Sequence, residues 1–489
     1  MNFEASPRRV SAQGSWPLHT VAATRILERS LAATLPAPTL MQRAGLATAR
    51  LALALAPHAR SYWIACGPGD NGGDGLEAAA WLRLWGKQPV VGWLGQPERA
   101  SADTRVAWQR ARAAGVAFSA QPPAQADFVI DALLGIGATR APEGQLAQWI
   151  AHIHALGTPV LAVDLPSGLQ ADTGWAPGTC VRAQHTLSLL TLKPGLFTAA
   201  GRDHAGQVWW DDLGADAEAS RVAGEPQARL AGAPVARARP HASHKGSYGD
   251  VAVLGGAAGM RGAALLAARA ALHHGAGRVY VALLDTATEV DPLQPELMWR
   301  APDALNPQEL TAVAGCGGGA AIAAALPRWL GAARLVLDAD GLNAVAQDPQ
   351  LQQQLRARAA RQRPTVLTPH PLEAARLLGC SATEIQRDRL RAAQQLAERY
   401  EATVVLKGSG TVIAAPDEPP LINPTGNARL ATAGTGDVLA GLIGARLAQG
   451  EPPRDAAAAA VWLHGAAADR WHSGQPLTAG ALAAALAPC

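Results

Sequence analysis

The feature that most constrains this chain is a recurring unit in which a short apolar run leads into a glycine-rich turn and then a helical pattern. In its first clear occurrence, the apolar run 62–65 leads into the loop 66–75, and helical spacing follows from Leu76 to Trp85. Short strands that alternate with helices predict a mainly parallel sheet, because parallel strands need long crossover connections that are usually helical. The sequence therefore predicts an α/β fold, and its 489 residues predict at least two domains.

Polar residues gather where the predicted strands of the first half end. The loop 66–75 mixes glycines with acidic and amide side chains, and the runs 128–130 and 160–163 each end in an aspartate before another glycine turn. The side chains that we expect to converge on one pocket are Asn71, Asp131, Asp164 and Ser167. The reason is that ligands, phosphates among them, bind beyond the carboxyl ends of parallel strands. The alternatives are an Asx-rich surface turn for the loop and an N-cap role for each aspartate.

The second half repeats the order of strand, glycine turn and helix. It opens with the apolar run 251–254, the turn 255–260 and a helical pattern over 262–274. Further apolar runs cover residues 278–284, 334–337, 366–368 and 403–406. Polar or glycine-rich turns follow most of these runs, so the second half is predicted to be another parallel α/β domain.

A second anion-binding loop is predicted near the C-terminal end. Gly434 and Gly436 allow the backbone to turn its N–H groups inward, just before an apolar run from Val438 that can start a helix. Asp437 lies at this helix start, where a carboxylate acts either as a helix cap or as a base beside a bound phosphate. A capped helix after a glycine loop is the plainer alternative.

Composition and charge narrow the classes of partner. The net charge is +3 and no Lys/Arg cluster stands out, so we expect small-molecule substrates, with neither nucleic acid nor membrane as a partner. The 5 cysteines are odd in number and widely separated, which argues against a disulfide framework or a cysteine-based zinc site. The first 16 residues lack the apolar core of a signal peptide, and a cytoplasmic location is predicted.

The composition also suggests where the domains divide. We expect an N-terminal extension over residues 1–15, a first domain over 16–214, a linker over 215–240 and a second domain over 241–489. The halves show no repeat of each other, so two different domains are predicted.

The first half resembles the NAD(P)H-hydrate epimerase family through the segments 67–75, 131–137 and 163–168. The resemblance implies a Rossmann-like three-layer fold, a bound potassium ion and interconversion of the R and S epimers of hydrated NADH and NADPH. By the same resemblance the potassium ligands are Asn71, Asp131 and Ser167. The implied contacts to the hydrate are Asp70, Asn71, Gly72, Gly73, Asp74, Gly135, Ile136, Gly137, Ala138, Thr139, Arg140, Ala141 and Asp164. Asp164 is the candidate acid or base, and Asp70 departs from the family, which usually has asparagine there.

The second half resembles the ribokinase-like superfamily, and within it the ADP-dependent NAD(P)H-hydrate dehydratase family, through the segments 245–249, 368–373, 407–411 and 434–437. The implied nucleotide contacts are Lys407, Gly408, Ser409, Gly410, Thr411 and Gly436. The implied contacts to the hydrate are Ala263, Gly317, His370 and Asp437. The segment 316–319 departs from the family, which usually reads Gly-Pro-Gly-Leu-Gly, and a more mobile loop is predicted there. A hydrogen-bonded structural histidine is the alternative for His370.

The two resemblances together predict a repair enzyme with two activities. The dehydratase would use Asp437 as a base while the hydroxyl of the hydrate attacks the terminal phosphate of ADP, and loss of phosphate would restore NAD(P)H and leave AMP. Magnesium is expected with the nucleotide, without an assigned ligand, and a homo-oligomer is expected from the family. The alternatives are a ribokinase-like small-molecule kinase with a regulatory first domain, and a nucleotide-sensing or scaffold protein that binds without turnover.

Overall fold

The computed structural model describes residues 6–215, 221–236, 238–285, 290–472 and 474–486. It divides into two compact units: residues 1–11 with 16–229, and residues 12–15 with 230–489. Parts of the predicted N-terminal extension and linker, namely residues 1–5, 216–220 and 237, lie outside the described residues. The domain boundaries proposed from the sequence stay predictions.

Unit 1 is built on a sheet of eight strands in the order β1-β9-β8-β7-β6-β3-β4-β5. The strands are β1 (Arg8–Arg9), β3 (Ser61–Cys66), β4 (Gln88–Trp93), β5 (Ala117–Phe118), β6 (Phe128–Ala132), β7 (Val160–Val163), β8 (His185–Leu189) and β9 (Gln207–Asp211). All neighbouring pairs are parallel except β1 with β9. The chain runs outward from β3 to β5 on one side and from β6 to β9 on the other. The strand order therefore reverses between β3 and β6, which is where a ligand crevice forms in an open parallel sheet.

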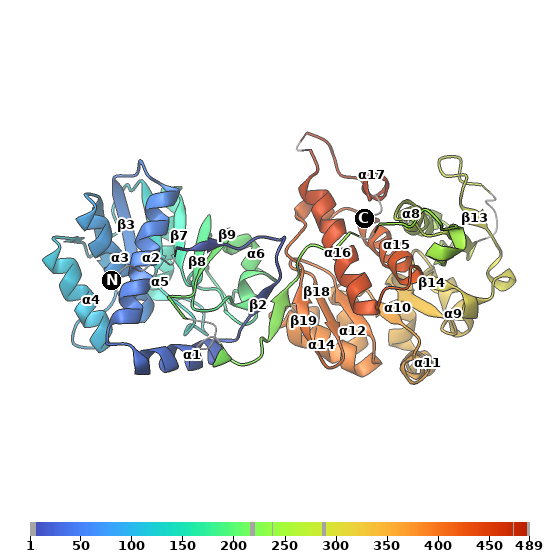
Figure 1. Cartoon of the computed structure of the whole chain (residues 1–489), viewed down its shortest axis with the longest axis horizontal. Helices are drawn as coiled ribbons and strands as arrows, with labels where there is room; N and C mark the ends of the chain where they lie inside the picture. Colours follow the sequence, from blue (N-terminus) through green and yellow to red (C-terminus); the bar gives the residue numbers. More distant parts are fainter. Residues whose placement is uncertain (1–5, 216–220, 237, 286–289, 473, 487–489) are drawn as a thin grey trace. The chain divides into compact units, whose positions relative to one another are not determined.

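Helices cover both faces of this sheet and close the apolar core. They are α1 (Val21–Thr34), α2 (Thr39–Leu55), α3 (Asp70–Leu84), α4 (Ala102–Ala113), α5 (Gly144–Leu156) and the short α6 (Gly201–His204). Buried side chains of α1 to α4 pack with Ile64 and Ile130 on one face. On the other face α5 packs with Trp63 and Val129, as the alternation of side chains along a strand requires. Figure 1 shows these helices in blue to green.

One helix boundary of unit 1 differs from the sequence-based prediction. The pattern predicted a free glycine loop over 66–75 and a helix from Leu76, but α3 already begins at Asp70. Glycine is what allows the early start, because a Cβ at Gly72 would lie 2.1 Å from the carbonyl oxygen of Gly67. The N-terminal turn of α3 therefore lies directly against the loop that follows β3.

Unit 2 is built on a larger sheet that contains the order β13-β12-β11-β14-β15-β16-β17-β18-β19. These strands are β11 (Asp250–Gly255), β12 (Arg278–Leu283), β13 (Met298–Trp299), β14 (Thr311–Ala314), β15 (Arg334–Leu337), β16 (Thr365–Leu367), β17 (Thr403–Leu406), β18 (Val412–Ala415) and β19 (Glu418–Ile422). The strands from β13 to β17 are parallel, and β18 and β19 are antiparallel additions. The order reverses between β11 and β14, so a second ligand crevice is expected there. The remaining strands of the described residues are β2 (Trp16–Leu18), which belongs to unit 1, and β10 (Ala228–Leu230), which lies where the two units divide.

Unit 2 also has helices on both faces of its sheet (Figure 1). One face carries α8 (Arg261–His273), α15 (Thr435–Ala448), α16 (Pro453–Asp469) and α17 (Ala479–Ala485). The other carries α9 (Ile322–Trp329), α10 (Ala339–Gln347), α11 (Pro349–Ala360), α12 (Pro371–Leu378), α13 (Ala382–Arg387) and α14 (Arg389–Tyr400). The predicted α/β class of both halves is confirmed. Among the helices of the described segments, none combines the length and the apolar character that a membrane span requires.

Two candidate active sites

The first site is centred on a buried carboxyl group at the switch point of unit 1. Asp131 lies within β6 and is fully buried, so it is not the N-cap of a helix. Its Oδ1 accepts the Ser167 hydroxyl at 2.6 Å, and its Oδ2 accepts the Ser167 backbone N–H at 2.8 Å. Burial raises the pKa of Asp131 to about 6, against the lowering effect of these bonds. Two of the predicted ion ligands are therefore in direct contact.

The surroundings of Asp131 fit a hard cation. No lysine or arginine of the described segments forms an ion pair with this carboxyl group, although a buried charge normally needs a partner. The third predicted ligand, Asn71, is in the first turn of α3, and its amide Nδ2 is buried without a hydrogen-bond partner. A Cβ on Gly135 would lie 3.3 Å from Asn71 Oδ1, so the loop after β6 passes close to this amide. Carboxylate, hydroxyl and amide oxygens form the donor set that hard cations prefer.

The candidate acid or base of unit 1 is held by a buried lysine. Asp164 follows β7 with φ of 65°, a left-handed backbone conformation that is uncommon outside glycine. Its Oδ1 accepts the Lys193 ammonium at 2.5 Å and the Leu189 N–H at 3.3 Å. Lys193 itself is fully buried. The alternative N-cap role for Asp164 is thereby excluded, because its carboxylate is bound to a side chain of a distant turn.

Further acidic groups surround this pair. Burial raises the pKa of Asp74 well above its usual value, and Asp164, Asp70 and Glu28 raise it further. Burial also raises the pKa of Glu28 on α1, with additional contributions from Asp70 and Asp164. Asp70 accepts hydrogen bonds from two hydroxyl groups at the start of α4. The negative charge that Asp70 adds is therefore fixed beside the predicted substrate loop.

The segment 135–141, predicted to contact the hydrate, joins β6 to the approach to α5. Gly135 adjoins Asn71, and a Cβ on Gly137 would lie 3.2 Å from the Arg25 guanidinium. The carbonyl oxygen of Thr139 accepts the Gln170 amide at 3.2 Å. The segment thus runs from the switch point toward the turn after β7.

The second site lies at the N-terminal end of α15. Gly434, with φ of 88°, is the N-cap of this helix, and no side chain caps it. Asp437 is in the first turn and is therefore not the cap that was considered as an alternative. Burial, followed by the nearby charge of Asp338, raises the pKa of Asp437 to about 6. A carboxylate with this pKa is suited to accept a proton near neutral pH.

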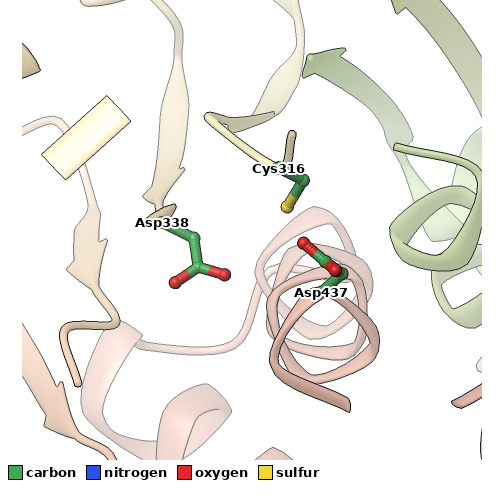
Figure 2. A group of neighbouring side chains, drawn as sticks. All are labelled: Cys316, Asp338 and Asp437. Atoms are coloured by element: carbon green, nitrogen blue, oxygen red, sulfur yellow. The ribbon is translucent and has the colours of Figure 1, made fainter. Parts of the chain in front are cut away.

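Asp437 faces two residues from neighbouring strands, Cys316 and Asp338 (Figure 2). One ligand atom of each of the three residues lies within 4.8 Å of the others. The Cys316 thiol lies beside the Asp437 carboxyl group, and burial raises the pKa of this thiol well above its usual value, so it is protonated and able to donate. The donor set does not fit Mg²⁺, because a thiol is a soft ligand and Mg²⁺ prefers six oxygens.

Lys407 links this cluster to the predicted nucleotide loop. Its ammonium donates to Asp338 Oδ1 at 2.6 Å and lies 4.0 Å from Glu373 Oε2. Burial by itself would lower the pKa of Lys407, but Asp338 and Glu373 outweigh it and raise this pKa. A Cβ on Gly436 would lie 3.5 Å from the ammonium, so two predicted nucleotide contacts meet at this point.

His370 serves first as a helix cap. Its Nδ1 accepts the N–H groups of Leu372 and Glu373, and the Glu373 carboxylate in turn accepts the His370 N–H at 2.7 Å. The other ring nitrogen, Nε2, lies 3.2 Å from Glu373 Oε1. Burial, followed by the charge of Lys407, lowers the pKa of His370, which favours the neutral ring. The structural alternative for His370 is therefore observed, and its predicted contact to the hydrate stays a prediction.

Two further predicted contacts meet at the switch point of unit 2. Gly317, with φ of 58°, follows β14, and a Cβ there would lie 2.9 Å from the Cβ of Ala263 on α8. Its carbonyl oxygen accepts the Ala257 N–H from the turn after β11 at 2.7 Å. The segments after β11 and β14 are thus joined, next to Cys316.

The remaining nucleotide contacts, residues 408–411, follow β17 in a turn held from behind by a buried arginine. Arg389 is fully buried and donates to the carbonyl oxygens of Leu406 and Lys407 at 3.0 and 3.2 Å. The Thr411 hydroxyl donates to the Gly408 carbonyl oxygen within the turn. Gly408 and Ser409 are exposed, as a loop that contacts a nucleotide would need.

Four residues of these sites were not assigned a role from the sequence: Lys193, Cys316, Asp338 and Glu373. Asp338 ends a predicted strand and Glu373 lies in a quoted segment, so the strand-end rule would have found both. Lys193 is a single charge within the apolar stretch 185–197, which is a usable signal of a buried, paired lysine. Cys316 had no signal beyond its departure from the family pattern.

Family models match both halves of the chain. Residues 251–487 match a family model described as NAD(P)H-hydrate dehydratase. Residues 37–195 match a model described as YjeF-related protein N-terminus.

Whole-length relatives share both halves. The Bifunctional NAD(P)H-hydrate repair enzyme Nnr of Escherichia coli is 39% identical over 452 residues, which cover 88% of this chain and 84% of that protein. The protein of the same name from Vibrio cholerae is 37% identical over 449 residues, with 88% of each chain covered. A solved Bacillus subtilis structure, titled an ADP/ATP-dependent NAD(P)H-hydrate dehydratase co-crystallized with ATP/Mg²⁺, is 35% identical and covers 51% of this chain and 91% of its own, with a TM-score of 0.44.

Proposed function

The chain belongs to the family of bifunctional NAD(P)H-hydrate repair enzymes, and from that premise we propose how its two sites divide the work. Unit 1 interconverts the R and S hydrates of NADH and NADPH, and unit 2 dehydrates the S hydrate to NAD(P)H. The observation that supports this division best is that each sheet has its own switch point with a cluster of buried and half-buried acidic groups near it, built around Asp131 and Ser167 in unit 1 and around Asp338 and Asp437 in unit 2. Asp164 is the acid or base of unit 1, and Asp437 is the base of unit 2.

In unit 2 the hydroxyl of the hydrate is a poor leaving group, and phosphorylation makes it a good one. Asp437 takes the proton of this hydroxyl while the hydroxyl oxygen attacks the terminal phosphate of ADP. The phosphoryl group is transferred to the hydrate, and AMP is the leaving group. The backbone N–H groups of Gly436 and Asp437 at the start of α15 face developing negative charge on the phosphoryl oxygens. Elimination of phosphate then restores the dihydronicotinamide ring. The Lys407 ammonium adds a positive charge beside Gly436, which suits a nucleotide phosphate.

In unit 1 a potassium ion fits the donors that the structure brings together. Asn71, Asp131 and Ser167 would hold it, and the ion would supply positive charge for the substrate's phosphates or its ring oxygen. The residues of this chain then do the rest: Asp164 exchanges a proton at the hydrated ring, and the segment 135–141 with the first turn of α3 encloses the substrate. Residues 70–74 and 135–141 remain the proposed substrate contacts.

The test is to give the full-length protein a mixture of R and S NADH hydrates with ADP, with ATP or with neither. Return of dihydronicotinamide absorbance and release of phosphate are followed together. With ADP we expect both epimers to be recovered, whereas Asp164→Asn should stop after the S fraction and Asp437→Asn should recover neither. A stable phosphorylated product without phosphate release would instead support the small-molecule kinase alternative, and binding without turnover would support the sensor alternative.

Two further proposals concern the cellular location and the oligomeric state of the protein. We propose a cytoplasmic location, supported by the free thiols of Cys66, Cys180, Cys316 and Cys380. We also propose a homo-oligomer, which size-exclusion chromatography with light scattering would test. Hydrated NADH, hydrated NADPH and ADP are the proposed small-molecule partners.

A further inference from the structure

Lys193 is a fully buried lysine whose ammonium has a complete set of partners. It follows β8 and donates to Asp164 Oδ1 at 2.5 Å, to the Leu189 carbonyl oxygen at 2.7 Å and to the Ser188 hydroxyl at 3.4 Å. An ammonium group has three N–H donors, so each of them has an acceptor inside the protein. Lys193 therefore has no donor left for a substrate, and its influence must pass through these partners.

Asp164 is fixed on one side and available on the other. Its backbone N–H donates to the Leu187 carbonyl oxygen at 2.7 Å, and its Oδ1 is held by Lys193 and by Leu189. Among the described residues, no group donates a hydrogen bond to its Oδ2. A left-handed backbone at a non-glycine residue is strained and persists where the surroundings impose it. The strained turn and the lysine together hold one oxygen and leave the other for the substrate.

The carboxyl groups around the Lys193–Asp164 ion pair indicate that Lys193 has a role besides packing. Glu28, Asp70 and Asp74 surround Asp164, and Lys193 lowers the pKa of Glu28 against the effects of burial and of the neighbouring carboxylates. Burial of an ion pair is a poor way to stabilise a fold, because desolvation offsets the attraction between the charges. A lysine that stabilised packing alone would be better replaced by an apolar side chain. Its place beside Asp164 points to the chemistry of the site.

We propose that Lys193 is a positioning residue for epimerisation, which holds the Asp164 carboxyl group oriented so that its free oxygen exchanges a proton with the hydrated ring. The inference rests on the proposed epimerase function of unit 1. Lys193 neither touches the substrate nor takes its proton. A positioning residue of this kind has a signature, since its removal matters only while Asp164 is present.

The experiment compares four variants of the full-length protein: Lys193→Met, Lys193→Arg, Asp164→Asn and the double variant Asp164→Asn with Lys193→Met. The rate of R-hydrate conversion is measured with ADP present, and S-hydrate dehydration by unit 2 is measured in the same samples. Lys193→Met should slow R-hydrate conversion by roughly a hundredfold, at the lower end of the range of acid–base contributions. Lys193→Arg should regain part of the rate, and the double variant should be no slower than Asp164→Asn alone. S-hydrate dehydration should stay unchanged throughout.

The matched control is Lys87→Met in the same unit, because the Lys87 ammonium also donates to backbone carbonyl oxygens but lies far from Asp164 in the sheet, after α3. It should epimerise like the unchanged protein. Equal epimerisation by Lys193→Met and the unchanged protein would overturn the inference, as would a double variant much slower than Asp164→Asn.

Lys193→Met leaves a carboxylate buried without its partner and could fail to fold for that reason. The double variant Asp164→Asn with Lys193→Met carries neither charge, so its rate relative to Asp164→Asn still tests the inference. Absence of epimerisation in the unchanged protein would instead refute the proposed function of unit 1.

Discussion

The dehydration rate should depend on pH through Asp437, and the dependence should move when Cys316 is changed. The pKa of Asp437 is raised to about 6 by burial and by Asp338, while the Cys316 hydrogen bond acts in the opposite direction. A base must be ionised to take a proton, so the rate should be constant well above pH 6 and fall about tenfold per pH unit below it. Asp437→Asn should abolish the activity at every pH.

Cys316→Ala removes a donor to the ionised carboxylate, which favours its protonated form. A thiol is a weak donor, so the lost bond is worth about 1 kcal/mol, which corresponds to about 0.7 pKa unit. The midpoint of the pH–rate profile should therefore rise by about 0.7 unit. At acidic pH the variant should be roughly fivefold slower, and above about pH 8 the two rates should coincide.

The assay is ADP-dependent recovery of dihydronicotinamide absorbance from purified S hydrate, with stopped reactions at each pH. Cys316→Ser keeps a hydroxyl donor and should keep the original midpoint. Cys180→Ala is the matched control, since Cys180 is also buried but lies in unit 1. Superimposed profiles for Cys316→Ala and the unchanged protein would refute the role of the thiol. A flat profile down to about pH 5 would refute Asp437 as the base.

Three further predictions concern the ion site, the nucleotide loop and a close backbone contact. In the absence of a cation, the raised pKa of Asp131 stabilises the fold at low pH, and this contribution is lost as pH rises from about 4 to about 6. Potassium should therefore raise the melting temperature more at about pH 8 than at about pH 5, and Asp131→Asn should remove the difference. Arg389→Met should raise the KM for ADP several-fold while unit 1 still epimerises, because the arginine holds the turn after β17; an unchanged KM would contradict this. Gly72→Ala should lower the melting temperature by several degrees through the clash with Gly67, measured by calorimetry, whereas Gly69→Ala, in open space and with φ of −96°, should cost less.

The fold could be predicted from the sequence because its signals are local. Each apolar run from β3 onward is followed by a turn and a helical pattern, and β7, β15 and β17 have the bounds that the runs suggested. The start of α3 could not be predicted in this way. A run containing Gly72, Gly73 and Gly75 reads as a loop, yet close packing against the turn after β3 stabilises it as a helix.

The positions of both candidate sites follow from topology, whereas the partners of their central residues do not. Parallel strands bring their carboxyl ends to one edge of a sheet, so Asp131 meets Ser167 in unit 1, and Cys316 lies near Asp338 in unit 2. The partner of each central aspartate comes from elsewhere in the chain: Lys193 lies 29 residues from Asp164, and only the folded structure pairs their charges.

The same reasoning explains why the two sites treat their aspartates differently. In unit 1 the Lys193 ammonium is bound directly to Asp164 at 2.5 Å, which fixes one oxygen of this carboxyl group in place. In unit 2 the ammonium of Lys407 is bound to Asp338, and burial together with the Asp338 charge outweighs the lowering effects of Cys316 and Lys407, so the pKa of Asp437 rises to about 6. A carboxylate that must take a proton and later release it benefits from such a pKa, because both of its states are then accessible near neutral pH. Asp338→Asn should therefore free the Lys407 ammonium to approach Asp437, and it also removes a charge that raises the pKa of Asp437. Both effects lower the midpoint of the pH–rate profile. A midpoint above 6 in this variant would contradict the prediction.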